Sequence, residues 1–126
     1  RLVRRLCEKC KASYEPSKNE MQEIEREVKA LPANIPKPEM GKETKLMKAG
    51  GCGECNNTGH KGRIGVFEII VIDDIVEPLV FKKPSEVELK GAMKEQGQIT
   101  MRQDGILKVL AGITDLAEVE RVVGAE

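Results

Sequence analysis

The sequence predicts an α+β fold, in which a small four-cysteine module with a short β element precedes a C-terminal lobe of three short helices. Three features of the 126 residues support this prediction. The cysteines form two Cys-x-x-Cys pairs, one at Cys7 and Cys10 and the other at Cys52 and Cys55. Apolar residues alternate over residues 63–72, as they do in a strand. After this stretch, three short amphipathic segments each begin at a residue that caps helices well.

Two apolar stretches flank the cysteine pairs. Leu2, Val3 and Leu6 recur at the spacing of a helical face, which predicts the last turns of a helix. Residues 63–72 give the strongest strand signal in the chain and are apolar on both faces. Because a strand with two apolar faces is normally covered on both sides, we expect it to pack against protein outside these 126 residues. Asp73 is placed to cap a short helical turn after the strand.

The segment between the cysteine pairs is predicted to contain one helix. Ser17 and Glu20 form a capping box, in which the hydroxyl and the carboxylate each accept a hydrogen bond from a free backbone N–H. The predicted apolar face consists of Met21, Ile24, Val28 and Leu31. Pro32 ends the helix, and residues 32–50 are expected to be extended, with a short strand near residues 46–47.

The C-terminal lobe is predicted from its helix signals. The predicted caps are Ser85 with Glu88, Thr100 with Gln103, and Thr114. The predicted stops of the first two helices are Gly97 and Gly112. Gly105 lies inside the second helix, where glycine costs about 1 kcal/mol relative to alanine. Either another segment approaches this glycine closely or the helix simply tolerates it.

The cysteine spacing indicates a metal site. Two residues between paired cysteines let both thiolates bind one ion from a tight turn, and two such pairs supply the four ligands of a tetrahedral Zn²⁺. We therefore predict a structural zinc held by Cys7, Cys10, Cys52 and Cys55, with residues 11–51 as an insertion. Gly53 is expected to turn backbone N–H groups toward the sulfurs, and His60 to be a solvent-facing turn residue. Two disulfides, or unrelated thiols, remain alternatives.

Composition excludes several classes of function. The chain has 21 basic and 21 acidic residues, so it lacks the basic excess that contacts with nucleic-acid phosphates require. Aromatic residues make up 2% of the chain, which leaves no platform for stacking bases. No apolar run is long enough for a membrane span. No Gly-x-x-x-x-Gly-Lys-Ser/Thr loop is present, so we expect these residues not to hydrolyse ATP by themselves.

Several strings resemble the C-terminal region of the ATPases of type II secretion and type IV pilus assembly. The matching strings are residues 1–10, residues 51–68, residues 104–105, residues 111–114 and residues 118–119. The string at 51–68, GCGECNNTGHKGRIGVFE, is the most specific, and the resemblance covers essentially the whole chain. His60 departs from the family pattern, because an aromatic residue is usual there. Residues 100–105 show a milder departure.

The resemblance implies how the chain is divided. It implies four parts: residues 1–6 as the end of a RecA-like ATPase core, 7–62 as a tetracysteine zinc-binding module with a helical insertion, 63–81 as a strand and connecting turn, and 82–126 as the helical lobe. In this family, a homohexamer uses ATP and Mg²⁺ to drive pilin or pseudopilin assembly. The resemblance therefore implies that ATP and Mg²⁺ bind only in the full-length protein, and that this part contains no catalytic residue.

The resemblance also implies partners and a location. Platform proteins of the inner membrane would be the partners, and the protein would lie in the cytoplasm at the inner-membrane face through them. Arg63 would stand at the strand entrance, near the nucleotide-bearing core and the neighbouring subunit, where it could contact nucleotide or a subunit interface. A solvated charge at a strand start is the alternative for Arg63. For the whole chain, the alternatives are a zinc-ribbon module that binds nucleic acid or protein, and a zinc segment of the DnaJ chaperone type.

Overall fold

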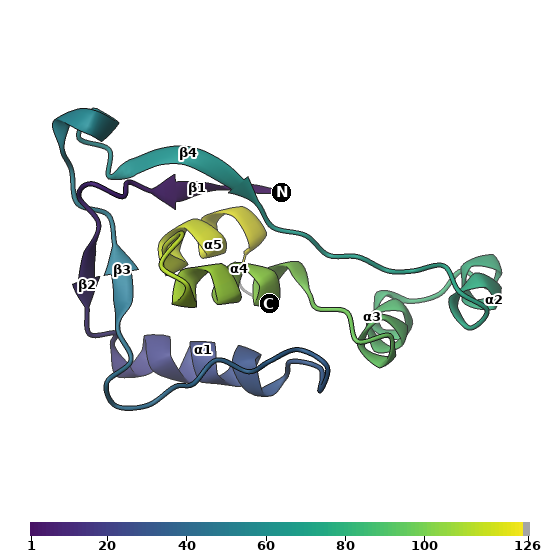
Figure 1. Cartoon of the computed structure of the whole chain (residues 1–126). Coiled ribbons are helices and arrows are strands. Elements are labelled where there is room, and N and C mark those ends of the chain that lie inside the picture. Colours follow the sequence, from purple (N-terminus) through teal and green to yellow (C-terminus); the bar gives the residue numbers. More distant parts are fainter. Residues whose placement is uncertain (125–126) are drawn as a thin grey trace.

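The computed structural model describes residues 1–124 and has a mixed α+β fold (Figure 1). In chain order the elements are β1 (Leu2–Leu6), β2 (Ala12–Tyr14), α1 (Lys18–Lys29), β3 (Leu46–Lys48), the short 3₁₀ helix η1 (Gly53–Cys55), β4 (His60–Gly65), α2 (Val76–Phe81), α3 (Glu86–Glu95), α4 (Met101–Leu110) and α5 (Leu116–Val123). Two antiparallel pairs form the sheets, β1 with β4 and β2 with β3. The fold class and the short strand at β3 are thus confirmed.

The first residues form a strand, so the prediction of a helix there is wrong. Strand β1 pairs with β4 in the register Leu2 to Gly65, and the register shifts between Arg4 and Leu6. Residues three apart normally face opposite sides of a strand, but an irregularity of this kind lets both point inward. Val3 and Leu6 are both buried as a result. The spacing of these two buried residues is therefore the same as on a helical face, although they lie in a strand.

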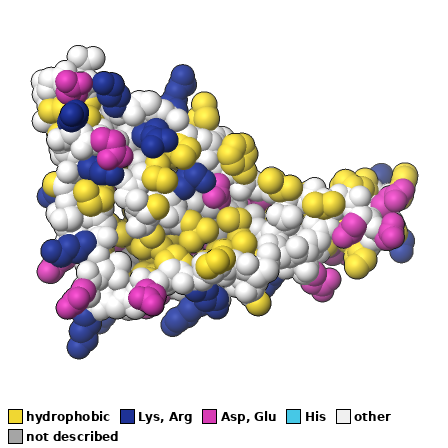
Figure 2. Space-filling view, in the orientation of Figure 1, with side chains coloured by type: hydrophobic (Ala, Val, Ile, Leu, Met, Phe, Trp, Pro, Cys, Tyr) yellow, Lys and Arg dark blue, Asp and Glu magenta, His cyan; other side chains and the backbone are white. Residues whose placement is uncertain are grey.

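Strand β4 is shorter than predicted. It begins at His60 and ends at Gly65, which pairs with Leu2, the first residue of β1. Residues 66–72 continue away from the body without forming a ladder. They lead into an arm that carries α2 and α3 (Figure 1). Several of the large apolar side chains of this arm are exposed, and Figure 2 shows them along its length.

The core lies where α1, α4 and α5 meet β3. Its buried members are Ile24, Val28, Leu31, Leu46, Ile106, Val109, Leu116 and Val119. Helices α4 and α5 lie between the β1–β4 pair on one side and α1 on the other (Figure 1). Arg102 of α4 is only 1% exposed. It joins α4 to α1, because its guanidinium contacts the carboxylates of Glu23 and Glu27 on α1. The same side chain donates to the carbonyl of Gly124 at 2.8 Å.

The three predicted capping boxes are confirmed, and one cap is corrected. The boxes are Ser17 with Glu20, Ser85 with Glu88, and Thr100 with Gln103. Helix α5 is capped by Asp115, not by Thr114. The hydroxyl of Thr114 instead donates to the carbonyl of Arg4 at 2.8 Å, which joins the turn before α5 to strand β1. A short side chain next to a helix start can cap it or bind elsewhere, and here the aspartate supplies the cap.

Gly105 is required by a close approach of α5. A Cβ atom at this position would lie 2.8 Å from Cγ1 of Val119, which is closer than packed carbon atoms allow. The close neighbour is a buried side chain of α5. Of the two explanations left open for Gly105, the structure therefore supports close packing. Within residues 1–124, no helix is long and apolar enough to cross a membrane.

Candidate metal centre

The two cysteine pairs lie in two turns of the same kind. In the first turn, the backbone N–H groups of Cys10 and Lys11 donate to the carbonyl of Cys7 at 3.3 and 3.0 Å. In the second turn, the N–H groups of Cys55 and Asn57 donate to the carbonyl of Cys52 at 3.3 and 2.8 Å. Each turn therefore folds its pair of side chains toward one side. The first turn follows β1, and the second contains η1 and precedes β4.

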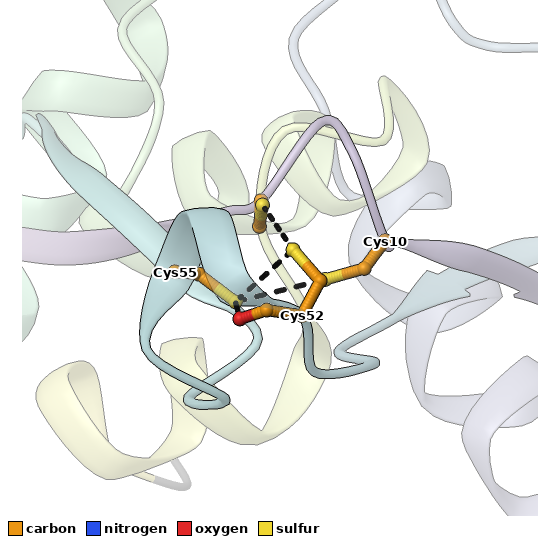
Figure 3. Close-up of side chains that lie close together, drawn as sticks. Cys10, Cys52 and Cys55 are labelled. Carbon is orange, nitrogen blue, oxygen red and sulfur yellow. Dashed lines mark hydrogen bonds between the residues drawn. The ribbon is translucent and has the colours of Figure 1, made fainter.

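The four sulfurs form one compact group. All four Sγ atoms lie within 4.8 Å of one another, although 41 residues separate the two turns. The Cys7–Cys52 and Cys10–Cys55 sulfur distances are 3.8 Å, and the Cys52–Cys55 distance is 3.7 Å. Figure 3 shows the side chains of Cys10, Cys52 and Cys55 turned toward one another. Thiolates about 2.3 Å from one Zn²⁺ in a tetrahedron lie about 3.8 Å apart, so this group could hold one such ion.

All four cysteines are free, and Cys55 and Cys10 differ in their tendency to ionise. The backbone N–H of Gly59 donates to the Cys55 sulfur at 3.2 Å. Burial opposes ionisation, but backbone hydrogen bonds from Cys52 and Gly59 lower the pKa of Cys55 to about 6. Burial, together with hydrogen bonds to neighbouring cysteines, raises the pKa of Cys10 to about 12. A bound cation would remove this difference in pKa between Cys55 and Cys10, because metal coordination deprotonates thiols.

Gly59, rather than Gly53, directs a backbone N–H at a sulfur. Its φ of 76° lies in the left-handed region, and a Cβ atom there would come within 2.5 Å of the Ala49 side chain. Its carbonyl also accepts from the N–H of Cys7 at 2.9 Å, so one residue contacts both turns. The role expected for Gly53 is not observed. The pattern Asn-Asn-Thr-Gly after Cys55 was the available signal, because such residues favour positive φ angles.

The centre is anchored to the turn between α4 and α5. The N–H of Leu6, the residue before Cys7, donates to the carbonyl of Ile113 at 2.9 Å. Nζ of Lys11, the residue after Cys10, donates to the carbonyl of Gly112 at 2.9 Å. Contacts on both sides of the first cysteine turn therefore reach the same turn of the helical lobe. Sequence reasoning did not find this link.

His60 is not a solvent-facing turn residue, which corrects the prediction. It is the first residue of β4, and its side chain is only 11% exposed. Its Nε2 lies 2.7 Å from Oδ2 of Asp115, the cap of α5, and its Nδ1 lies 3.2 Å from the carbonyl of Thr58. His60 thus joins the second cysteine turn to the last helix. Within residues 1–124, the only cluster of side chains that could hold a metal ion consists of the four cysteine sulfurs.

Arg63 stands apart from the metal group. It lies in β4 directly opposite Arg4 of β1 and is exposed. The Arg4 guanidinium has a partner, because it donates to the Glu118 carboxylate at 2.6 and 2.9 Å. Within residues 1–124, the Arg63 guanidinium has no hydrogen-bond or ion-pair partner. Opposite positions carrying like charges are unfavourable in a sheet, and no carboxylate within residues 1–124 offsets the charge of Arg63.

Comparisons with known proteins show the family to which the chain belongs. The family model described as "Type II/IV secretion system protein" matches residues 1–121. The chain belongs to this family. It is 36% identical over 126 residues to the type II secretion system protein E of Dickeya dadantii, covering 100% of this chain and 22% of that protein.

One relative from a pilus system and a second from a secretion system match as well. The type IV pilus assembly ATPase PilB of Thermus thermophilus is 34% identical over 122 residues, covering 94% of this chain and 12% of that protein. The type II secretion system ATPase E of Vibrio cholerae is 33% identical over 122 residues, covering 97% of this chain and 22% of that protein. The chain thus spans roughly an eighth to a fifth of the length of these relatives.

Proposed function

We propose that these residues are the zinc-stabilised C-terminal part of an ATPase that drives type II secretion or type IV pilus assembly. The match of residues 1–121 to the family is the observation that carries this proposal. The relatives named as ATPases contain this region as a small share of their length. No phosphate-binding loop occurs in the 126 residues, so ATP and Mg²⁺ would bind to the remainder of the longer polypeptide.

The metal is proposed to be Zn²⁺, held by Cys7, Cys10, Cys52 and Cys55. Four thiolates at tetrahedral spacing suit this ion, and four protein ligands leave no open position for a reacting molecule. The role is therefore structural rather than catalytic. A bound ion would join two turns that are 41 residues apart in the chain. Binding of this kind contributes folding free energy directly.

The mechanical role is proposed to be coupling. The metal centre contacts the turn between α4 and α5 through Leu6 and Lys11, so movement of β1 would be passed to the helical lobe. In a homohexamer, ATP-driven movement of the core would reach partners through this lobe. Platform proteins of the inner membrane are the proposed partners, with the protein at the cytoplasmic face of that membrane. Arg63, whose guanidinium has no partner in residues 1–124, is proposed to contact a carboxylate or phosphate across a subunit interface.

A second candidate is a zinc-ribbon module that binds nucleic acid or protein. The four-cysteine centre alone fits both candidates. The equal numbers of acidic and basic residues disfavour a nucleic-acid surface, and so no nucleic-acid partner is proposed. Binding of nucleic acid that weakens steeply with added salt would favour this second candidate.

The proposal is tested on two proteins, the natural polypeptide that carries these residues and the 126-residue chain. The longer protein should hydrolyse ATP and contain one zinc per chain, whereas the 126-residue chain should contain zinc and show no hydrolysis above a buffer blank. A longer polypeptide without ATPase activity would contradict the proposed function. Nucleotide binding by the 126-residue chain at micromolar affinity would show that a nucleotide site lies within these residues, contrary to the proposal.

A further inference from the structure

Residues 66–72 form an apolar extended segment that pairs with no strand within residues 1–124. The side chains of Phe67, Ile69 and Val71 are 63%, 56% and 49% exposed. Residues two apart along an extended chain point to the same side, so these three form one apolar stripe. Ile72 is 59% exposed as well. A contiguous apolar surface of this kind marks a contact with other protein.

One backbone edge of the segment is already occupied. The N–H of Phe67 donates to Oδ2 of Asp104 at 2.9 Å, and the N–H of Val71 donates to Oε1 of Gln96 at 3.0 Å. The amide of Gln96 also donates to the carbonyl of Val71 at 2.7 Å. Side chains from α4 and from the end of α3 therefore take the place of a neighbouring strand. They hold the segment extended and fix which edge remains available.

The opposite edge is open. Val66 exchanges two hydrogen bonds with Arg1, at 2.8 and 3.0 Å, and these continue the β1–β4 ladder by one pair. Beyond Val66, the N–H groups that face this same edge are those of Glu68 and Ile70, because alternate residues of a strand donate to the same side. Neither donates a backbone hydrogen bond within residues 1–124. An unpaired edge beside an apolar stripe is a template for another strand.

We propose that the open edge of residues 66–72 binds a β-strand supplied by the same polypeptide upstream of Arg1. The proposal rests on the proposed function, in which this chain is part of a longer protein. The relatives are several times longer than the chain, so enough polypeptide exists to supply the strand. The amino group of Arg1 lies at the near end of the open edge, bonded to the carbonyl of Val66.

The chemistry of the stripe defines the strand that fits. Phe67, Ile69 and Val71 carry no charge, and the carboxylate of Glu68 accepts a hydrogen bond from the N–H of Met101 at 3.0 Å. Ile70 points to the other side and lines a cavity of about 190 Å³ with Leu89 and Met93 of α3. The incoming strand therefore needs apolar side chains against the stripe and gains its alignment from backbone hydrogen bonds.

Hydrogen exchange tests the proposal on the natural longer polypeptide and the 126-residue chain. In the longer polypeptide, a peptide covering residues 66–72 should exchange its amides at least about 100-fold more slowly than in the 126-residue chain. Equal exchange rates in the two proteins would overturn the proposal. That result is separate from failure of the proposed function, which would appear as a longer polypeptide without ATP hydrolysis.

A pair of matched variants gives a second test. Ile69→Lys should lower the melting temperature of the longer polypeptide by about 3 °C or more, because it places a charge against the docked strand. The same change should leave the melting temperature of the 126-residue chain unaltered. Val87→Lys is the control, since Val87 is 80% exposed on α3 and lies outside the stripe. A 126-residue chain that dimerises, and that Ile69→Lys makes monomeric, would show that a second copy occupies the edge and would overturn the proposal.

Discussion

Glu118 of α5 binds Arg4 of β1 twice, through the backbone and through the side chain. One carboxylate oxygen accepts from the Arg4 N–H at 2.9 Å, and the other accepts from the guanidinium at 2.6 and 2.9 Å. Arg121 adds two more hydrogen bonds to the same carboxylate. The Glu118 side chain is 2% exposed, so these five donors replace its hydration. Hydrogen bonds from Arg121 and Arg4 hold the pKa of this carboxyl well below its usual range, although burial opposes them.

The first prediction concerns pH. Because the pKa of Glu118 is lowered on folding, its carboxylate stabilises the fold above the unfolded-state pKa of about 4.3. This contribution is lost as pH falls toward the folded-state pKa, since the unfolded chain then binds more protons. Glu118→Gln should reduce the free energy of unfolding by about 1–3 kcal/mol at pH 7, and the difference from wild type should shrink below pH 4. Urea unfolding at several pH values measures both effects.

Glu120→Gln is the matched control for Glu118→Gln. Glu120 lies on the same helix but is exposed, so its replacement should change the free energy of unfolding by less than about 0.5 kcal/mol. A Glu118→Gln protein whose loss of stability is the same at pH 7 and pH 3 would contradict the pKa argument.

The second prediction concerns metal removal. Purified protein should contain one Zn²⁺ per chain, and a strong chelator should lower the melting temperature and expose four reactive thiols. The effect should reach α5, because Leu6 and Lys11 flank Cys7 and Cys10 and bind the turn before α5. Hydrogen exchange of residues 111–116 should therefore rise after chelation. Native protein without zinc, or with four thiols that already react, would rule out this assignment.

The third prediction compares two glycines in helices. Gly105→Ala should destabilise the protein, since overpacking against Val119 costs about 1–3 kcal/mol and exceeds the helix-propensity gain of about 1 kcal/mol. Gly91→Ala in α3 should stabilise the protein by about 0.5–1 kcal/mol, because no atom lies within 4 Å of the new Cβ. Chemical denaturation measures both changes. Adding Val119→Ala to Gly105→Ala should give a coupling energy of at least about 0.5 kcal/mol, and strict additivity would refute the close approach.

The fourth prediction concerns Arg63 in the longer polypeptide. Arg63→Ala should lower ATPase activity several-fold while zinc content and melting temperature stay the same, because the guanidinium is exposed and free within residues 1–124. Lys61→Ala is the control, since Lys61 is 62% exposed and forms only a surface ion pair with Glu54 at 3.4 Å. Full activity and hexamer formation in both variants would identify Arg63 as a solvated charge.

The features that the sequence predicted well are local ones. The capping boxes at Ser17, Ser85 and Thr100 need only residues three apart, and all three form. The cysteine group was predictable because spacing within each pair fixes its turn. The stop at Gly112 follows equally local logic, since its φ of 76° favours glycine.

The features that the sequence did not predict depend on distant partners. The register shift in β1 places Val3 and Leu6 on one side, which made a strand look like a helix. The ion pair of Glu118 with Arg4 and the contact of His60 with Asp115 join residues 114 and 55 positions apart. No local pattern signals such pairs. The end of β4 was also missed, because it depends on where its partner strand begins.

The placement of β1 against α5 has a consequence for protein synthesis. The ribosome makes β1 first and α5 last within these residues, yet the two are joined by contacts between positions 114 residues apart. Contacts of such sequence separation form late, because loop closure costs entropy before any contact compensates for it. A nascent chain that has already paired β1 with β4 would thus still expose the surface that α5 covers. Chaperones that recognise apolar segments would have their longest opportunity to bind during this interval.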